Sequence, residues 1–243
     1  MRGAGGWRQG GHDGLGTARP AQVSRLTGRA VCCARRRQVP TVGQVVAVVD
    51  AQLGSGLLRC LGPGCGGRLA RWGSGVERDL VGLGGTAERV RPRRALCASC
   101  GVSRVLLPDS MLRRRQYGVE VIWAGLLAAA RGRPWNQVAA QLGVPYTTVR
   151  EWLRRFARRA DRVHAWLCGL LPRLVDDPVW PAGTASAAGD VLAVLGALHQ
   201  QMPGRWPVVA GLSPGQLAAR LSRCGLLAPS WPPGAVNTSS PVT

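Results

Sequence analysis

Two pairs of cysteines constrain the fold of this 243-residue chain more than any other feature. Cys60 and Cys65 form the first pair, Cys97 and Cys100 form the second, and a glycine directly follows each pair. A glycine at this place allows a tight turn at positive φ and lets backbone N–H groups approach sulfur closely. Four thiolates around one tetrahedral zinc ion could stabilise a segment that is too small to bury a core of its own. The pattern therefore predicts a structural Zn²⁺ site formed by these four cysteines.

The first pair encloses four residues, which lies within the spacing of zinc ligands although two residues are more common. Four free buried thiols are the alternative interpretation. A catalytic zinc is disfavoured, because no histidine or carboxylate lies beside either pair. The apolar runs Val45–Val49 and Leu57–Leu58 predict short strands, so residues 45–108 are expected to form a small β zinc ribbon. Cys168 and Cys224 lie at apolar helical positions and are expected to be core thiols.

The charge of the chain indicates a polyanionic partner. Its 32 basic residues are all arginine and stand against 12 acidic residues, which gives a formal net charge of +20. The excess lies in residues 1–39, 89–115 and 131–162, whereas the region from Val175 onward is neutral. Residues 1–44 are predicted to form a basic, disordered arm, because they lack hydrophobic periodicity. The other two stretches flank recognisable motifs, and a nucleic acid is the expected partner.

The spacing of apolar residues in 109–175 predicts a helix-turn-helix domain. Gly143 falls where the turn between the second and third helices needs a positive φ. Val138 and Ala139 are expected to face the third helix, where small side chains let two helices cross closely. We expect a first helix over 119–130 that Gly132 ends, a second over 135–141 that Pro134 begins, and a third that Pro145 begins.

The outward face of the third helix carries the predicted DNA contacts. Near its N-terminus, Tyr146, Thr147 and Arg150 are expected to reach base edges in the major groove. Arg150 suits a bidentate contact with guanine, and Thr147 suits a thymine methyl group. Two alternatives remain, namely a three-helix bundle without a DNA role and binding of RNA instead of DNA. The residues expected to contact phosphates are Arg154, Arg155, Arg158 and Arg159.

Beyond the third helix, the apolar register continues in alternating steps of four and three residues until Pro172, which predicts an extended C-terminal helix. This stripe either packs against the rest of the chain or forms the seam of a homodimer. A dimer would bind two half-sites about one helical turn apart. The stripe consists of Val149, Leu153, Phe156, Ala160, Val163, Leu167 and Leu170.

The C-terminal part is expected to be a small neutral helical region over residues 176–227. Asp190–His199 predicts one helix, and Ser213-Pro214 is a good start for a second helix over Gln216–Cys224, with Gly225 as its stop. From Ala228 onward, proline, serine and threonine without periodicity predict a flexible tail, residues 228–243.

Several of these segments together resemble a family of bacterial zinc-ribbon and helix-turn-helix proteins from high-GC genomes, a domain of unknown function often described as transposase-like. The order of ribbon and helix-turn-helix is also similar to the N-terminal half of insertion-sequence transposases. The resemblance covers about residues 45–175, and it implies DNA binding without implying a known reaction. The segments that carry it are Cys60 to Trp72, Cys97-Ala-Ser-Cys100-Gly-Val, Arg113-Arg-Arg-Gln-Tyr-Gly-Val-Glu-Val-Ile and Gln137 to Phe156.

No enzyme activity and no catalytic residue are predicted. A cut-and-paste transposase needs three carboxylates that hold two metal ions, but only Asp176, Asp177 and Asp190 follow the helix-turn-helix. No Ser/His/Asp set, Walker loop or dinucleotide-binding fingerprint is present. No apolar run is long enough to span a bilayer, so a cytoplasmic, nucleoid-associated protein without a membrane partner is expected.

The sequence thus predicts a mainly α fold, with a small β zinc ribbon followed by a helix-turn-helix unit of three or four helices and a short helical C-terminal region. The expected function is that of a DNA-binding protein with a structural zinc ribbon, transposase-like or regulatory, without its own catalytic core. One alternative is the DNA-recognition half of a split or decayed transposase. Another is a zinc-stabilised scaffold for protein interactions.

Overall fold

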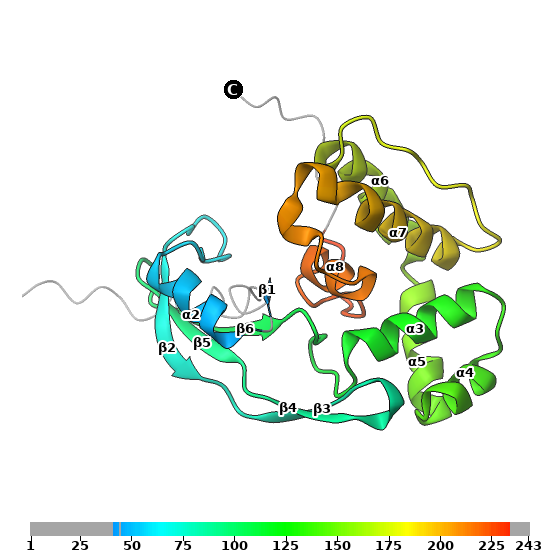
Figure 1. The fold of residues 1–243 in the computed structure, drawn as a ribbon, viewed down its shortest axis with the longest axis horizontal. Helices are drawn as coiled ribbons and strands as arrows, with labels where there is room; N and C mark the ends of the chain where they lie inside the picture. Colours follow the sequence, from blue (N-terminus) through cyan, green and yellow to red (C-terminus); the bar gives the residue numbers. More distant parts are fainter. Residues whose placement is uncertain (1–40, 44, 234–243) are drawn as a thin grey trace, which may run out of the picture. The chain divides into compact units, whose positions relative to one another are not determined.

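The computed structural model describes residues 41–43 and 45–233 (Figure 1). Among these residues, a small set of strands comes first and seven helices make up most of the rest, which confirms the predicted fold class. Most of the predicted arm, residues 1–40 and 44, lies outside the described residues, as does the end of the predicted tail, residues 234–243. The strands are β1 (Thr41–Val42), β2 (Leu69–Ser74), β3 (Arg78–Val81), β4 (Ala87–Val90), β5 (Arg93–Cys97) and β6 (Ser103–Pro108). The helices are α2 (Val46–Gly54), α3 (Val119–Ala130), α4 (Trp135–Leu142), α5 (Tyr146–Ala157), α6 (Ala160–Leu174), α7 (Ala187–Arg205) and α8 (Pro214–Leu221), with short 3₁₀ helices η1 (Leu83–Gly85) and η2 (Pro207–Val209).

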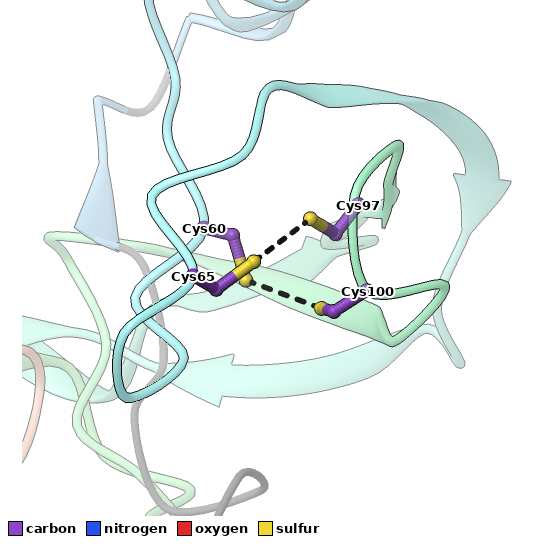
Figure 2. Close-up of side chains that lie close together, drawn as sticks. All are labelled: Cys60, Cys65, Cys97 and Cys100. Atoms are coloured by element: carbon purple, nitrogen blue, oxygen red, sulfur yellow. Dashed lines mark hydrogen bonds between the residues drawn. The ribbon is translucent and has the colours of Figure 1, made fainter.

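The ribbon contains a four-stranded sheet in the order β1-β6-β5-β2. Strand β6 pairs antiparallel with β5 and parallel with β1, and β2 pairs antiparallel with β5 so that Leu69 lies opposite Cys97. The loops that carry the two cysteine pairs face each other (Figure 2). A separate hairpin joins β3 to β4. The small apolar core of this part consists of Val42, Val49, Leu53, Cys60, Leu69, Ala95, Cys97 and Leu106.

Three predictions at the start of the ribbon are wrong. Val45–Val49 does not form a strand, because these residues enter helix α2, whose buried side chains Val49 and Leu53 are four residues apart and pack into the ribbon core. Packing of one helical face has thus outweighed the strand preference of a valine-rich run. Residues 41–42 are not disordered, since Val42 is buried and its carbonyl accepts a hydrogen bond from the N–H of Asp109 at 2.9 Å. Leu57–Leu58 lies outside the named strands, although the Leu69 N–H donates to the Leu58 carbonyl at 3.0 Å.

The three predicted helices of the helix-turn-helix are confirmed as α3, α4 and α5. Gly132, after α3, has a φ of +85°, a value at which glycine carries no Cβ penalty. Val138 and Val149 are fully buried, and they join the main core together with Ile122 of α3 and Trp152 of α5. This apolar side of the three helices leaves the other side of α5 exposed to solvent.

The predicted single extended helix is wrong, because α5 ends at Ala157 and α6 begins at Ala160. The interruption lets the two parts of the apolar stripe pack against different partners. Residues Val149 and Phe156 pack with α3, whereas α6 packs alongside α7. Val163 and Leu167 are at most 1% exposed within a single chain, so the stripe follows the first alternative and packs intramolecularly. Dimerisation stays a prediction, but this apolar stripe is not the seam of the dimer.

The two predicted C-terminal helices are confirmed, with shifted boundaries. Helix α7 is longer at both ends than predicted, and α8 begins at Pro214 with a capping box in which Ser213 and Gln216 satisfy each other's backbone N–H groups. The prediction of a flexible tail from residue 228 is wrong up to residue 233. Trp231 is 7% exposed and packs edge-to-face on Trp166 at a centroid distance of 5.5 Å. The area that an indole buries outweighs the lack of regular structure around it.

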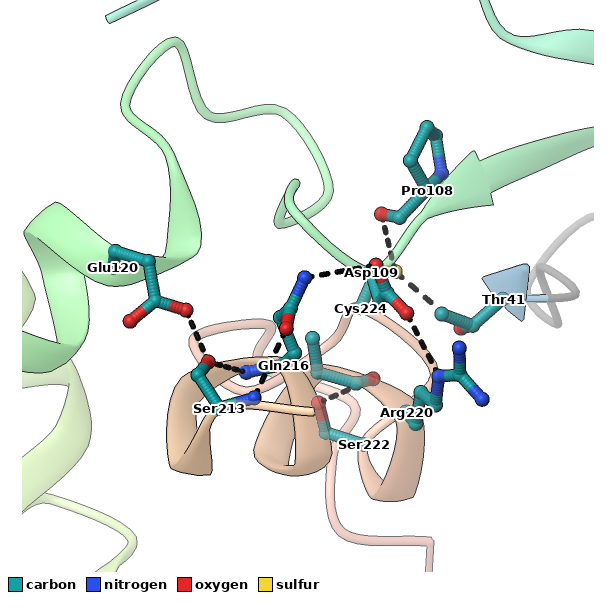
Figure 3. Close-up of polar contacts among 10 residues, drawn as sticks. Thr41, Pro108, Asp109, Glu120, Ser213, Gln216, Arg220, Ser222 and Cys224 are labelled. Atoms are coloured by element: carbon teal, nitrogen blue, oxygen red, sulfur yellow. Dashed lines mark hydrogen bonds and ion pairs between the residues drawn. The ribbon is translucent and has the colours of Figure 1, made fainter. Parts of the chain in front are cut away.

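Helix α8 contacts both the ribbon and the helix-turn-helix (Figure 3). The buried carboxylate of Asp109, next to the end of β6, accepts a hydrogen bond from the Arg220 Nε at 2.8 Å. Cys224 is buried as predicted, and its thiol lies 3.3 Å from the Thr41 hydroxyl, whereas Cys168 is only half-buried and is not the core thiol that was predicted. On the other side, the Ser213 hydroxyl donates to the Glu120 carboxylate of α3. The C-terminal region therefore holds the last ribbon strand and the first helix of the helix-turn-helix.

A bilayer-spanning helix must be both long and apolar, and none of the helices in residues 41–43 and 45–233 meets these two conditions.

Candidate metal centre and nucleic-acid interface

Tight turns present both cysteine pairs from the ribbon. In the first, the Cys65 N–H donates to the Gly62 carbonyl at 3.0 Å, and Gly66 follows with a φ of +57°. In the second, the Gly101 N–H donates to the Cys97 carbonyl at 3.0 Å, and Gly101 has a φ of +64°. Both predicted glycine turns are thus present. A 2.7 Å hydrogen bond from the Cys60 N–H to the Gly67 carbonyl closes the first turn against the start of β2.

The four sulfur atoms gather at one point (Figure 2). They lie within 4.8 Å of one another, with 3.5 Å between Cys65 and Cys97 and 3.9 Å between Cys60 and Cys100. A zinc–sulfur distance of about 2.3 Å places the sulfurs of a regular tetrahedron about 3.8 Å apart. The four cysteines could therefore hold one metal ion, and a set of four sulfur ligands fits a soft or borderline cation such as Zn²⁺.

Hydrogen-bond donors surround the Cys60 sulfur. The Gly62 N–H lies 3.4 Å from it, and the Arg104 Nη2 lies 3.9 Å from it. Arg104 is only 4% exposed, and sequence reasoning did not single it out. Four thiolates and one dication would carry two net negative charges, so a buried guanidinium beside them is electrostatically favourable. Its position in β6, four residues after Cys100, was the only available sequence signal.

The thiols of the cluster differ strongly in pKa. Burial acts to raise the pKa of Cys97, but the backbone N–H groups of Cys100 and Ser99 outweigh it and lower the pKa to about 6. At Cys65, the Gly67 N–H acts to lower the pKa, but the neighbouring thiols of Cys97 and Cys100 together with burial raise it to about 11. A bound cation favours the ionised form of all its sulfur ligands, which removes this competition among the thiols.

The turn between α4 and α5 has the geometry that the helix-turn-helix pattern predicts. Gly143 adopts a left-handed conformation, with φ +64° and ψ +29°. The Val144 N–H donates to the Ala139 carbonyl at 3.1 Å, and Val144 is itself buried. Gly125 of α3 allows close packing, since a Cβ there would lie 3.3 Å from the Leu142 side chain. Helix α5 is therefore held firmly with its N-terminus at the surface.

The predicted base-reading residues share the exposed face of α5. Tyr146, Thr147 and Arg150 are all exposed to solvent. Within the described residues, Arg150 forms no ion pair. Tyr146 packs against Trp135, the first residue of α4, at a centroid distance of 5.4 Å. The two rings are 56% and 41% exposed, and this aromatic pair was not predicted.

The predicted phosphate-contacting arginines fall into three groups. Arg158 is exposed at the end of α5. Arg154 and Arg155 both pair with Glu151, at 2.7 Å in the case of Arg154, and the bond from Arg155 is the main reason for the lowered pKa of Glu151. Arg159 instead donates to the backbone carbonyls of Arg155 and Ala228, so its guanidinium is used within the fold. The spacing of Glu151 to Arg154 and Arg155 was a readable signal for these pairs.

Comparison with known proteins agrees with this geometry. Residues 119–163 match the family model of a homeodomain-like domain, a DNA-binding domain type typical of transposase DNA-binding regions. The match covers α3, α4, α5 and the beginning of α6, and it suggests DNA binding rather than catalysis. Searches of the curated proteins and of the solved structures found no match.

Proposed function

We propose that this protein binds duplex DNA sequence-specifically through helix α5, in a transposase-like or regulatory role and without a catalytic core of its own. The observation that carries the proposal is the exposed basic face of α5, held by a glycine turn inside a segment that matches a homeodomain-like domain. A helix-turn-helix places such a helix in the major groove with its N-terminal residues against the bases.

The exposed residues of α5 have separate proposed roles. Arg150 has its guanidinium available for a bidentate contact with a guanine edge, and Tyr146 and Thr147 lie beside it on the same face. Arg154, Arg155 and Arg158 lie further along the helix, where they are suited to phosphate oxygens. Phosphate contacts hold the protein in register, and base contacts provide the specificity.

The four clustered cysteines are proposed to hold a structural Zn²⁺. The ribbon core is small, so sulfur–metal bonds would supply much of its folding free energy. The metal would hold the two cysteine turns together, and the ribbon would then support the strand β6 that leads into the helix-turn-helix.

Two of the carboxylates after the helix-turn-helix, Asp176 and Asp190, have structural partners, which supports the proposal that the chain lacks a catalytic core. Asp176 pairs with Arg205 at 2.7 Å. Asp190 accepts a hydrogen bond from the Thr184 N–H at 2.6 Å, ahead of α7. Asp177 lies in a turn with a φ of +51°. A two-metal site would require three carboxylates directed at one point.

The test is enrichment of a random duplex library by the zinc-loaded protein, with Arg150→Ala run in parallel. An exposed arginine at the end of α6 serves as the control, in the form Arg173→Ala. We expect a defined motif for the wild type and the control and a degraded motif for Arg150→Ala, and the symmetry of the motif reports whether one or two chains bind. Retention without any motif would contradict the proposal and favour nonspecific polyanion binding or an interaction scaffold.

A further inference from the structure

A hollow of about 490 Å³ lies beside helix α5. Its floor is apolar, because it consists of Tyr117 and Trp152, two buried rings in an edge-to-face contact at 5.2 Å. Its walls are polar, and three of their six residues are arginines. They are formed by Arg78 and Asp79 of β3, by Arg114, Arg115 and Gln116 of the loop before α3, and by Thr148 of α5.

The β3–β4 hairpin belongs to the ribbon segment in sequence, but backbone hydrogen bonds attach it to the helix-turn-helix. The Val81 N–H donates to the Gln116 carbonyl at 2.8 Å, and the Gly118 N–H donates to the Val81 carbonyl at 2.8 Å. Leu80 is buried next to them. This attachment brings the exposed Arg78 to the side of α5, so the basic walls are a built feature of the fold.

Arg115, which lines the hollow, is repelled by the charge of Arg155 of α5. Burial lowers the pKa of Arg115 and the charge of Arg155 lowers it further, whereas the charge of Glu151 acts in the opposite direction. Glu151 faces this group but is shared between Arg154 and Arg155. The carboxylate of Asp79, itself exposed, lies 3.8 Å from Arg89, so the site as a whole keeps an excess of positive charge that an anion would relieve.

The hollow lies on the flank of α5 that carries Thr148, on the Thr147 side of the face proposed to read bases. Thr148 and Trp152 line it, and they follow Tyr146 and Arg150 by two residues each, so the side chains of Tyr146 and Arg150 lie about 200° away round the helix and that of Thr147 about 100° away. A helix with its side chains is about 10–12 Å across and fills a major groove about 12 Å wide. The flank of an inserted helix therefore faces the sugar–phosphate backbone that borders the groove.

We propose that Arg78, Arg114 and Arg115 form a binding site for backbone phosphate of the DNA strand that borders the groove occupied by α5. This inference rests on the proposed function and extends the interface to the β3–β4 hairpin and the loop before α3. Guanidinium groups suit this ligand, because their N–H groups match the spacing of phosphate oxygens. The Thr148 hydroxyl and the Gln116 amide supply further donors at the same place.

The first test measures how the affinity for a short fluorescent duplex depends on salt. Arg78→Gln and Arg114→Gln remove exposed charges, and Arg173→Gln removes an exposed charge at the end of α6 as a control. Each lost phosphate contact lowers the slope of log affinity against log salt by about 0.9. We expect that loss for each hollow variant and no change for the control, with the enriched motif unchanged in all three. Thermal unfolding of each variant verifies that the fold is retained.

The second test replaces single phosphates of the duplex by neutral methylphosphonates. At one or two positions that border the groove, the replacement should weaken the wild type but not Arg114→Gln, since the same contact is already absent. If the wild type binds duplex and the hollow variants keep its full salt slope, this inference is wrong while the proposed function stands. If the wild type binds no duplex, both are wrong.

Discussion

Arg150 and Arg158 are exposed arginines at opposite ends of α5, so they separate base reading from phosphate binding at the scale of single residues. Arg150→Ala should reduce the preference for the enriched motif over random duplex by about 1–3 kcal/mol, because a bidentate guanine contact is lost. Arg158→Ala should weaken binding to all sequences alike and reduce the salt slope by about 0.9. Competition binding at several salt concentrations measures both quantities. Equal, sequence-independent losses from the two substitutions would contradict the assignment of Arg150 to base reading.

The cysteine cluster provides a second prediction at the residue scale. Cys97→Ser should abolish stoichiometric zinc binding and lower the thermal stability of the ribbon, because a hydroxyl is a poor zinc ligand at neutral pH. Elemental analysis of the purified protein and thermal unfolding measure the two effects. Cys168 is a half-buried thiol outside the cluster, so Cys168→Ser is the matched control and should keep the full metal content. Equal zinc content in the two variants would argue against the site.

Some contacts of single residues could be predicted from the sequence, and others could not. The four cysteines that the pattern paired are those whose sulfurs meet in the structure: each pair is presented by a local turn, and the pairing of β2 with β5 brings the two turns together. Arg104, by contrast, could not be identified, since its approach to Cys60 depends on the pairing of β5 with β6. Arg159 was assigned to phosphates on charge alone, but its contact with the Ala228 carbonyl involves a residue 69 positions away.

The turn between α4 and α5 governs the interface at the scale of elements. Gly143→Ala should lower the free energy of unfolding by about 1–2 kcal/mol, because a Cβ disfavours the left-handed conformation found there. Urea unfolding measures the change. Gly169 is exposed inside α6 with open space around its Cα, so Gly169→Ala should instead raise stability by up to about 1 kcal/mol. The same sign of effect at both positions would show that the turn conformation is not limiting.

The predicted helix boundaries agree with the structure where a proline or a glycine marks the end of a helix. Pro134, Gly143 and Pro145 marked the ends of α4 and the start of α5 correctly, because these residues restrict φ within their own turn. Helix α2 was missed, because a short valine-rich run is compatible with either a strand or a helix and only its packing against the ribbon decides.

A buried ion pair connects distant parts of the chain at the scale of the whole molecule. The Asp109 side chain is 1% exposed and pairs with Arg220, which lies 111 positions later. Asp109→Ala should lower the free energy of unfolding by about 2 kcal/mol, because it removes a buried carboxylate that accepts hydrogen bonds from Arg220 and Gln216, although the Arg220 side chain itself is 32% exposed. Asp176 also pairs with an arginine but is 80% exposed, so Asp176→Ala should cost at most about 1 kcal/mol.

Urea unfolding of both aspartate variants tests this prediction, and zinc content should remain unchanged in each. Losses of the same size at Asp109 and Asp176 would mean that α8 does not hold the ribbon strand β6. A selective loss at Asp109 would indicate that the C-terminal region stabilises both the ribbon and the helix-turn-helix.

The sequence by itself determined the features that depend on a few neighbouring residues. These are the cysteine turns, the order of ribbon and helices, and the glycine turn before α5, whose conformations follow from local φ restrictions and from apolar periodicity. Only the tertiary structure decided which apolar surfaces meet. In the tertiary structure, the apolar stripe of α6 packs against α7, and Trp231 is buried. Arg78 of the β3–β4 hairpin lines the same hollow as Arg114 and Thr148. Burial free energy depends on surfaces that approach from far along the chain, and a local pattern cannot report that approach.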